Sequence, residues 1–178
     1  MFLSFHQLRF GFTFAYRFVP AQDAAFFSYL AAHGGRRFER ALDFVGLDFY
    51  PGTIFPPMLA PGDTYRHELA QSVGTLRDCL MPLAHLGHRV PIWVTENGVP
   101  TGVLSDRQQA AALSELVRAA RDYGRTFNLT DYRWFNLRDS VSTRLAPPFA
   151  TDGLLRSDYS RKPSFGAYRR LASQLGAL

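Results

Sequence analysis

Short apolar runs alternate along this chain with longer segments whose apolar positions have helical spacing. Four runs rich in aromatic and β-branched residues are typical of strands, at positions 8–18, 44–50, 92–96 and 129–135. Each is followed by apolar positions that recur every three to four residues, which predicts helices at 21–33, 67–83, 105–123 and 163–175. Residues 51–63 hold four prolines and two glycines, and they predict an irregular loop.

Local signals predict where two of these helices begin and end. The pair Gly34-Gly35 is expected to stop the first helix, and Gly124 to stop the third. Ser105 and Gln108 have the spacing of a capping box, which predicts the start of the third helix.

The alternation predicts an α/β fold with a parallel sheet of four β/α units, because a helical crossover returns the chain to the same side of the sheet. Polar and aromatic residues follow each predicted strand. In parallel α/β folds the carboxyl ends of the strands form the rim that carries the active site. The residues placed on this rim are Tyr16, Arg17, Asp48, Tyr50, Glu96, Asn97, Trp134, Asn136, Arg138 and Asp139.

Each rim residue also has a structural explanation. A carboxylate such as Glu96 can cap the next helix or pair with an arginine. Tyr50 can pack at the rim with its hydroxyl in water, and Trp134 can belong to the core. Arg138 can pair with Asp139. The joint occurrence of tyrosine, glutamate and tryptophan at successive strand ends favours a functional rim, because independent structural needs do not usually gather these residues at one edge.

Composition and charge exclude several classes of protein. A chain of 178 residues with 47% hydrophobic and 15% aromatic residues is expected to form one globular domain over 1–178. No stretch reaches the ~18 apolar residues of a membrane helix. The opening segment lacks the basic region and cleavage site of a signal peptide, so a cytoplasmic location is expected. The net charge is +5, but the arginines are scattered, and no nucleic-acid partner is expected.

No cofactor or metal is expected from the sequence. No Gly-x-Gly-x-x-Gly or phosphate loop follows any predicted strand, which argues against the alternative of a doubly wound nucleotide-binding domain. His85 and His88 lie in a predicted loop with no third ligand nearby, so they do not indicate a zinc site.

Four segments resemble consecutive parts of one enzyme clan. WVTENG at 93–98 resembles the seventh-strand motif of retaining β-glycosidases in the large (β/α)₈ glycoside hydrolase clan, most closely the family 1 β-glucosidase form Thr-Glu-Asn-Gly. The clan's sixth strand is similar to DFVGLDFYPG at 43–52, its eighth to DYRWFNLRDS at 131–140, and its closing segment to GLLRSDYSRKPSFGAYRRL at 153–171. Family 1 enzymes read Trp-Ser-Leu-x-Asp-Asn in the eighth strand, so a related family of the clan is an alternative.

The resemblance implies roles for individual residues. It implies that Glu96 is the nucleophile, that Tyr50 hydrogen-bonds to it, and that Trp134 forms the floor beneath the reacting sugar. Candidate ligands of the sugar, or of the residues that contact it, are Asn136, Arg138 and Asp139. Asn97 is expected to shape the turn after the strand.

One part of the clan's chemistry has no counterpart in this sequence. The general acid/base of the clan is a second glutamate, preceded by asparagine, at the end of strand four, whereas the strands here correspond to strands five to eight. No Asn-Glu pair occurs in the chain, and Glu39, Glu68 and Glu115 are expected to be surface charges on helices. The expectation is therefore a carboxyl-terminal half of a (β/α)₈ barrel, with the amino-terminal half missing.

The expected function is that of a fragment of a retaining glycoside hydrolase that acts on carbohydrate through a covalent glycosyl-enzyme. The alternative is an inactive carbohydrate-binding or structural remnant that lacks the general acid/base. Four β/α units leave two parallel edge strands unpaired, so the expected partner is either the missing half or a second copy of the chain.

Overall fold

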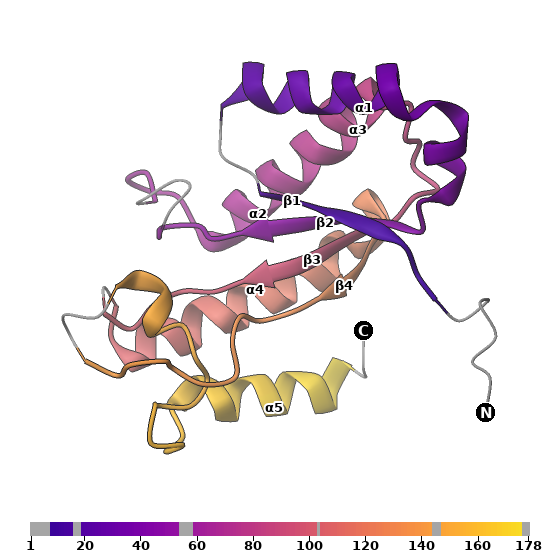
Figure 1. Cartoon of the computed structure of the whole chain (residues 1–178). Helices are drawn as coiled ribbons and strands as arrows, with labels where there is room; N and C mark the ends of the chain where they lie inside the picture. The colour runs from indigo at the N-terminus through magenta and orange to yellow at the C-terminus, as the bar shows by residue number, and fades with distance from the viewer. Residues whose placement is uncertain (1–7, 16–18, 54–58, 103, 144–146, 176–178) are drawn as a thin grey trace.

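The chain folds around one parallel sheet in this computed structural model, which describes residues 8–15, 19–53, 59–102, 104–143 and 147–175. The sheet has the order β1-β2-β3-β4, and all its pairings are parallel. The predicted α/β fold is confirmed, and β1 and β4 lie at the two edges (Figure 1). The strands are β1 (Gly11–Ala15), β2 (Phe44–Phe49), β3 (Ile92–Asn97) and β4 (Leu129–Tyr132).

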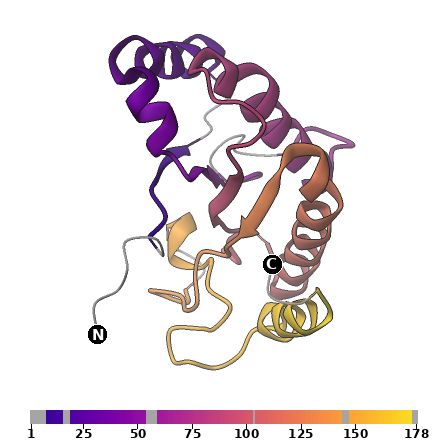
Figure 2. The same cartoon turned by 90° about the vertical axis from the view of Figure 1, so that its right-hand side faces the viewer.

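The helices form a layer along the outside of the curved sheet, running from α1 round to α5 (Figure 2). Within this layer α1 packs against α3, α2 against α4, and α4 against α5. In the described part of the chain, no helix is long and apolar enough to cross a membrane. The helices are α1 (Pro20–Ala41), α2 (Tyr65–Gly74), the π-helix η2 (Thr75–Leu80), α3 (Met81–Leu83), α4 (Asp106–Phe127), the 3₁₀ helix η3 (Pro148–Ala150) and α5 (Pro163–Leu175).

The hydrophobic core lies between the sheet and this helical layer. Val45, Leu47 and Phe49 of β2 are completely buried, as are Ile92 and Val94 of β3. Because side chains alternate along a strand, the residues between them face the other side of the sheet. That second face combines polar groups with aromatic rings: Thr95 donates a hydrogen bond to Asp48, the Trp93 indole donates one to Thr130, and the Trp93 ring stacks on that of Phe44. The face that would line the interior of a closed barrel thus carries hydrogen-bonding groups.

Of the two helix stops predicted at glycines, the first is confirmed and the second was wrong. Gly35 has a non-helical backbone, with φ 57° and ψ −167°, which divides α1 into two helical parts, and the second part continues to Ala41. This second part of α1 carries Phe38, whose ring packs 6.0 Å from that of Phe12 on β1. Helix α4 passes through Gly124 and ends at Phe127, followed by the cap residue Asn128, which adopts the left-handed conformation with φ 51°. Asparagine tolerates this conformation and ends helices for the same reason as glycine.

Other element boundaries follow local hydrogen bonding. The predicted capping box is confirmed, because the Ser105 hydroxyl accepts from the Gln108 amide and the Gln108 side chain accepts from the Ser105 amide. The helical segment predicted from His67 begins earlier, at Tyr65, because Thr64 caps it by accepting from the His67 amide. The fourth strand is shorter than predicted and ends at Tyr132.

Candidate active site

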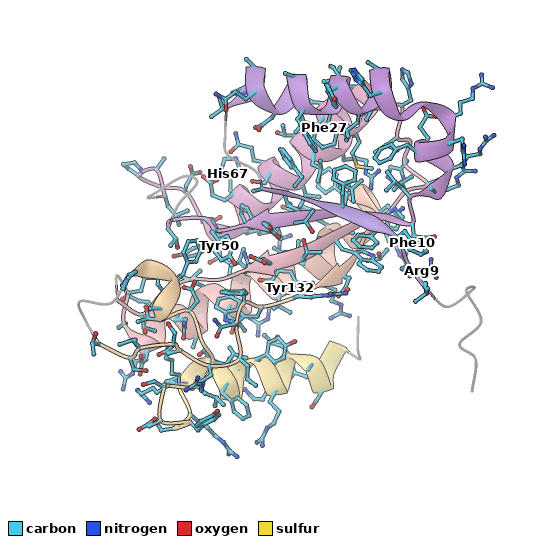
Figure 3. The ribbon with its side chains drawn as sticks, viewed as in Figure 1. Arg9, Phe10, Phe27, Tyr50, His67 and Tyr132 are labelled. Atoms are coloured by element: carbon cyan, nitrogen blue, oxygen red, sulfur yellow. The ribbon has the colours of Figure 1, made fainter. Side chains whose placement is uncertain are left out.

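The site begins with a contact between Tyr50 and Glu96, at the carboxyl ends of β2 and β3. The Tyr50 hydroxyl donates a hydrogen bond of 2.8 Å to Glu96 Oε2. Burial, together with this bond and the Glu96 charge, raises the pKa of Tyr50 far above its ordinary value. Tyr50 therefore keeps its proton and acts only as a donor to Glu96. Figure 3 shows Tyr50 at the arrowhead end of the sheet, opposite Arg9 and Phe10 at the other end.

Asp48 is a second carboxyl group beside this contact. It is the Cα partner of Glu96 in the pairing of β2 with β3. The Thr95 hydroxyl donates a 3.0 Å hydrogen bond to Asp48 Oδ1. Burial, followed by the charge of Glu96, raises the pKa of Asp48 to about 6, although the bond from Thr95 opposes the shift. The sequence placed Asp48 on the rim without a role, and its two-residue spacing from Tyr50 was the signal that both face the same side.

Asn97 ties the central strands together at the same end of the sheet. It is completely buried, and its amide donates a 2.7 Å hydrogen bond to the carbonyl of Phe49 on β2. Its side-chain carbonyl accepts from the hydroxyl of Tyr132 on β4. Asn97 therefore links β2, β3 and β4, a wider role than the turn-shaping one expected from the sequence. These links hold the backbone on either side of Glu96 in a fixed position.

Aromatic rings border the site. The Trp134 indole donates a 2.9 Å hydrogen bond to the backbone carbonyl of Asp152, which fixes the orientation of a half-buried ring. The Tyr50 ring packs edge-on against Phe149, with centroids 5.0 Å apart, and against Phe135, with centroids 6.3 Å apart. Phe149 is 44% exposed. The rim thus combines a carboxylate with exposed aromatic surface.

The structure turns Asn136 and Arg138 toward their own loop. The Asn136 side chain accepts a 2.9 Å hydrogen bond from the Arg138 amide, which is a turn-forming contact. The Arg138 guanidinium donates to the carbonyl of Ser157 and lies 4.9 Å from the centroid of the Tyr159 ring. Both side chains remain accessible at the rim. Tyr16 and Arg17, also predicted there, lie outside the described residues.

Asp139 does not line the rim, because it is buried in an ion pair. Its Oδ1 lies 2.7 Å from Lys162 Nζ, and both side chains are 1% exposed. Asp139 also accepts from the Gly153 amide and from Ser142. The alternative of a pair with Arg138 does not form. Asp139 joins the loop after β4 to the start of α5, and its carboxylate oxygens are already bonded within the fold.

Asp152 is a buried carboxyl group that the sequence did not single out. It is completely buried, and neither carboxyl oxygen has a hydrogen-bond partner. Its side chain packs against Gly98, where an added Cβ would lie 3.1 Å from the carboxyl carbon. Burial raises the pKa of Asp152 to about 7, and the charge of Asp139 adds to the shift while that of Lys162 opposes it. Only the tertiary fold shows this burial, because Asp-Gly reads as a turn.

We expect the Asp152→Asn substitution to stabilise the protein at high pH. The raised pKa means that the stability contributed by neutral Asp152 is full below about pH 4 and is lost as the pH rises to about 7. Asparagine never ionises, so the variant's advantage in free energy of unfolding should grow by about 2 kcal/mol between pH 5 and pH 8. Urea unfolding at both pH values measures this difference. Asp158→Asn should show no such growth, because the pKa of Asp158 is lowered by its bonds to Ser160, so this carboxyl is ionised in the folded and the unfolded protein at both pH values. An advantage of Asp152→Asn that is equal at both pH values would contradict the prediction.

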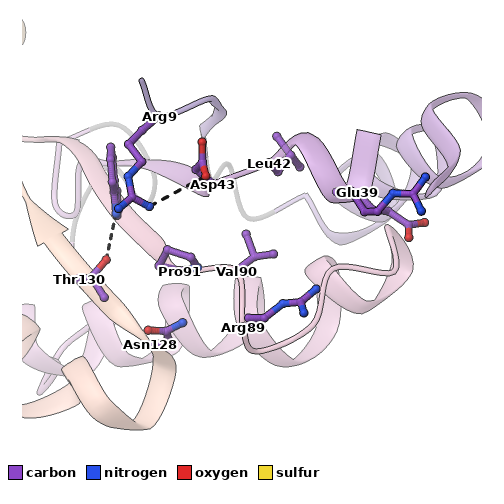
Figure 4. Close-up of a pocket in the computed structure, with 11 residues that line it drawn as sticks. Arg9, Glu39, Leu42, Asp43, Arg89, Val90, Pro91, Asn128 and Thr130 are labelled. Atoms are coloured by element: carbon purple, nitrogen blue, oxygen red, sulfur yellow. Dashed lines mark hydrogen bonds and ion pairs between the residues drawn. The ribbon is translucent and has the colours of Figure 1, made fainter. Parts of the chain in front are cut away.

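One hollow in the described part of the chain lies away from this site. It has a volume of about 690 Å³ and is found where the strands begin, lined by residues that include Arg9, Asp43, Arg89 and Thr130 (Figure 4). Active sites of parallel barrels lie at the opposite, carboxyl end. Within the described ranges no three His, Cys, Asp or Glu side chains are grouped so as to hold a metal ion.

The other glutamates lie on the helical layer. Glu39 is on α1, Glu68 on α2 and Glu115 on α4. The surface position expected for Glu68 was wrong: it is 4% exposed, and burial raises its pKa. These positions on the outer helices leave Glu96 as the one glutamate at a strand end.

Known proteins resemble this chain through their folds. No family model matches it, and no curated protein does. A GH2 β-galacturonidase from Eisenbergiella tayi aligns with a TM-score of 0.58 and 14% identity over 79% of this chain and 25% of its own. A family 39 glycoside hydrolase from Bacteroides cellulosilyticus WH2 aligns with a TM-score of 0.54 and 23% identity over 86% of this chain and 31% of its own. A β-glucosidase, 1317, aligns with a TM-score of 0.54 and 22% identity over 94% of this chain and 44% of its own.

These glycoside hydrolases are TIM-barrel proteins, and the chain spans between a quarter and less than half of their length. At this identity the likeness concerns the fold. The four parallel β/α units correspond to part of such a barrel, in agreement with the expectation from the sequence. The chain therefore has the fold of half a (β/α)₈ barrel of the kind found in glycoside hydrolases.

Proposed function

We propose that this chain is the carboxyl-terminal half of a retaining O-glycoside hydrolase in which Glu96 is the nucleophile. The observation that carries the proposal is the 2.8 Å hydrogen bond from Tyr50 to Glu96 at the carboxyl ends of neighbouring parallel strands. The motif Thr95-Glu96-Asn97-Gly98 also favours the family 1 form within the clan. Tyr50, Glu96 and Trp134 together supply an orienting donor, a carboxylate and an aromatic platform.

In the proposed reaction Glu96 attacks the anomeric carbon of the sugar. A Glu96 carboxylate oxygen forms a bond to that carbon, and the bond from carbon to the leaving oxygen breaks, so the leaving group departs with the electron pair. Water then hydrolyses the glycosyl ester and restores the carboxylate. Tyr50 holds one Glu96 oxygen by donating to it, which leaves the other oxygen available for attack.

Trp134 is proposed as the platform beneath the sugar. The indole is fixed through its Nε1 bond to the Asp152 carbonyl, so its ring is held in place before substrate binds. Asn136 and Arg138 are proposed as weaker ligands from the adjoining loop. Asp139 is left out of the binding site, since its oxygens are occupied by Lys162, Gly153 and Ser142.

The chain alone is proposed to lack the general acid/base. Retaining glycosidases place two carboxyl groups roughly 5 to 5.5 Å apart across the sugar, and the second group is worth on the order of 10² to 10⁴ in rate. Glycosides with a poor leaving group need that group most, because their departing oxygen must be protonated. The chain is therefore expected to act only on substrates whose leaving group departs without protonation.

The two open edges of the sheet predict association. Strands β1 and β4 lie at the edges of the sheet, and Phe10 and Phe26 beside β1 are 58% and 40% exposed. An unpaired parallel edge with apolar neighbours is a pairing surface. Light scattering after size exclusion should show species larger than the 20.1 kDa chain. A sharp monomeric peak with cooperative unfolding at all concentrations would contradict this prediction.

A dinitrophenyl glycoside panel tests the proposed function. Dinitrophenolate leaves without protonation, so nucleophilic attack by Glu96 can release it in the absence of an acid/base. Release of dinitrophenolate from one or more sugars supports the proposal. Binding of a sugar without release supports the alternative of a carbohydrate-binding remnant. A protein that neither binds a sugar nor releases dinitrophenolate would contradict both hypotheses.

A further inference from the structure

Asp48 and Glu96 are brought side by side by an irregularity in the sheet. Leu47 pairs with Val94, but the next residue of β2, Asp48, pairs with Glu96, so the register skips Thr95. A bulge of this kind inserts one residue into a strand and re-aims its side chains. As a result, the side chains of Thr95 and Glu96 both make hydrogen bonds on the same side of the sheet. The Thr95 hydroxyl donates to Asp48, and Glu96 accepts from Tyr50.

The spacing of the sheet brings the backbones of the two residues close together. Neighbouring strands lie about 4.8 Å apart, and Asp48 and Glu96 are Cα partners across that gap. Both side chains are half-buried, so water screens their charges incompletely. Two carboxylates in such a position cannot both ionise freely, and one tends to retain a proton.

We propose that Asp48 is a functional residue of this site: it holds a proton beside Glu96 and thereby sets the charge of the carboxyl pair. Asp48 has two neighbours on β3. One is the Thr95 hydroxyl, a neutral hydrogen-bond donor, and the other is Glu96, its charged pairing partner. On β1 its pairing partner is the apolar Ala15. Arg17, which follows β1 in the sequence, lies outside the described residues.

The other charged group near the site reinforces this arrangement. The charge of Asp152 acts on Tyr50, as does that of Asp48. The described groups whose charges act on Asp48 and Tyr50 are therefore acids, namely Glu96, Asp152 and Asp48 itself, and no described cation is among them. The raised pKa of Asp48, about 6, agrees with this geometry.

The proton on Asp48 changes what the site offers to a ligand. Below about pH 6 Asp48 is neutral, so it adds no charge beside Glu96, and the Asp48 carboxyl can donate a hydrogen bond to a sugar hydroxyl. Above that pH it is an acceptor and adds a second negative charge next to the proposed nucleophile. This effect on the reaction rests on the proposed glycosidase function, whereas the proton on Asp48 does not.

Carboxyl titration by carbon-13 NMR on the full chain tests the proposal without any assay of activity. The Asp48 signal, assigned by its loss in Asp48→Asn, should titrate with a midpoint near pH 6 in the wild type. In Glu96→Gln the midpoint should fall by about one pH unit, the size of shift caused by one nearby like charge. Glu39→Gln, a matched change on α1 at the other end of the sheet, should leave it unchanged.

Two results would overturn the proposal. One is an Asp48 midpoint in the ordinary range of aspartate in the wild type, and the other is a midpoint that does not move in Glu96→Gln. If dinitrophenolate release is observed, its pH profile should contain a step near pH 6 that is absent in Asp48→Asn. A correct titration in a protein without glycosidase activity would refute the proposed function and leave the carboxyl pair intact.

Discussion

Replacing Glu96 by glutamine is expected to abolish the release of dinitrophenolate from an activated glycoside. Glutamine keeps the size of the side chain and can still bond to Tyr50, but its amide does not attack an anomeric carbon. Removal of a nucleophile costs on the order of 10⁴-fold or more in rate. The release rate of the variant should therefore fall to that of the substrate in buffer, measured by absorbance at equal protein concentration.

Two controls separate loss of chemistry from loss of fold. Glu39→Gln makes the same change on α1, where Glu39 contacts His85, and it should retain the wild-type rate. Circular dichroism of Glu96→Gln should match that of the wild type. A variant that is folded and still releases dinitrophenolate at the wild-type rate would show that Glu96 is not the nucleophile.

Replacing Asp139 by alanine is expected to destabilise the protein by about 3 to 5 kcal/mol, because it leaves a buried cation without its partner. Lys162 is 2% exposed, and its remaining contacts are the Thr101 hydroxyl and the Thr151 carbonyl, which carry no full charge. The Gly153 amide also loses its acceptor. Equilibrium unfolding in urea measures the loss.

The control for this change is Asp158→Ala in the same loop region. Asp158 is exposed and accepts a hydrogen bond from the Ser160 amide, so its removal should alter stability little. Removing both charges with Asp139→Leu and Lys162→Met should recover much of the loss, since no uncompensated charge remains buried. Equal destabilisation by Asp139→Ala and Asp158→Ala would show that the ion pair has no structural importance.

The sequence predicted the repeating units of the fold because local patterns determine them. Ser105 and Gln108 cap α4 through contacts three residues apart, and the strands at 44–49 and 92–97 are apolar runs bounded by turn residues. The glycine pair also marked a real interruption, because Gly35 breaks the helical geometry of α1, although Phe38 beyond the break packs on Phe12 in a second helical part. The stop predicted at Gly124 failed, because α4 continues to Phe127 and the left-handed Asn128 caps it.

The candidate site was likewise predictable from the sequence only in part. The contact between Tyr50 and Glu96 joins residues 46 apart in the chain, and their positions at strand ends, together with the resemblance, placed both on the rim. The buried state of Asp139 could not be foreseen, because its partner Lys162 is 23 residues away and becomes a neighbour only when α5 packs. The pairing of Asp48 with Glu96 depends on the bulge at Thr95. A register shift of this kind has no signature in the sequence.

The most direct test of the account is the intact mass of the protein after incubation with an activated 2-deoxy-2-fluoro glycoside. Such a substrate carries dinitrophenolate as its leaving group, and its fluorine slows hydrolysis of the glycosyl ester, so the covalent intermediate accumulates. The account predicts one added fluorosugar per chain, carried on the peptide that contains Glu96 and absent in Glu96→Gln. A folded protein that gains no mass from any sugar that it binds, or that carries the label on another residue, would contradict the assignment of Glu96 as a glycosidase nucleophile.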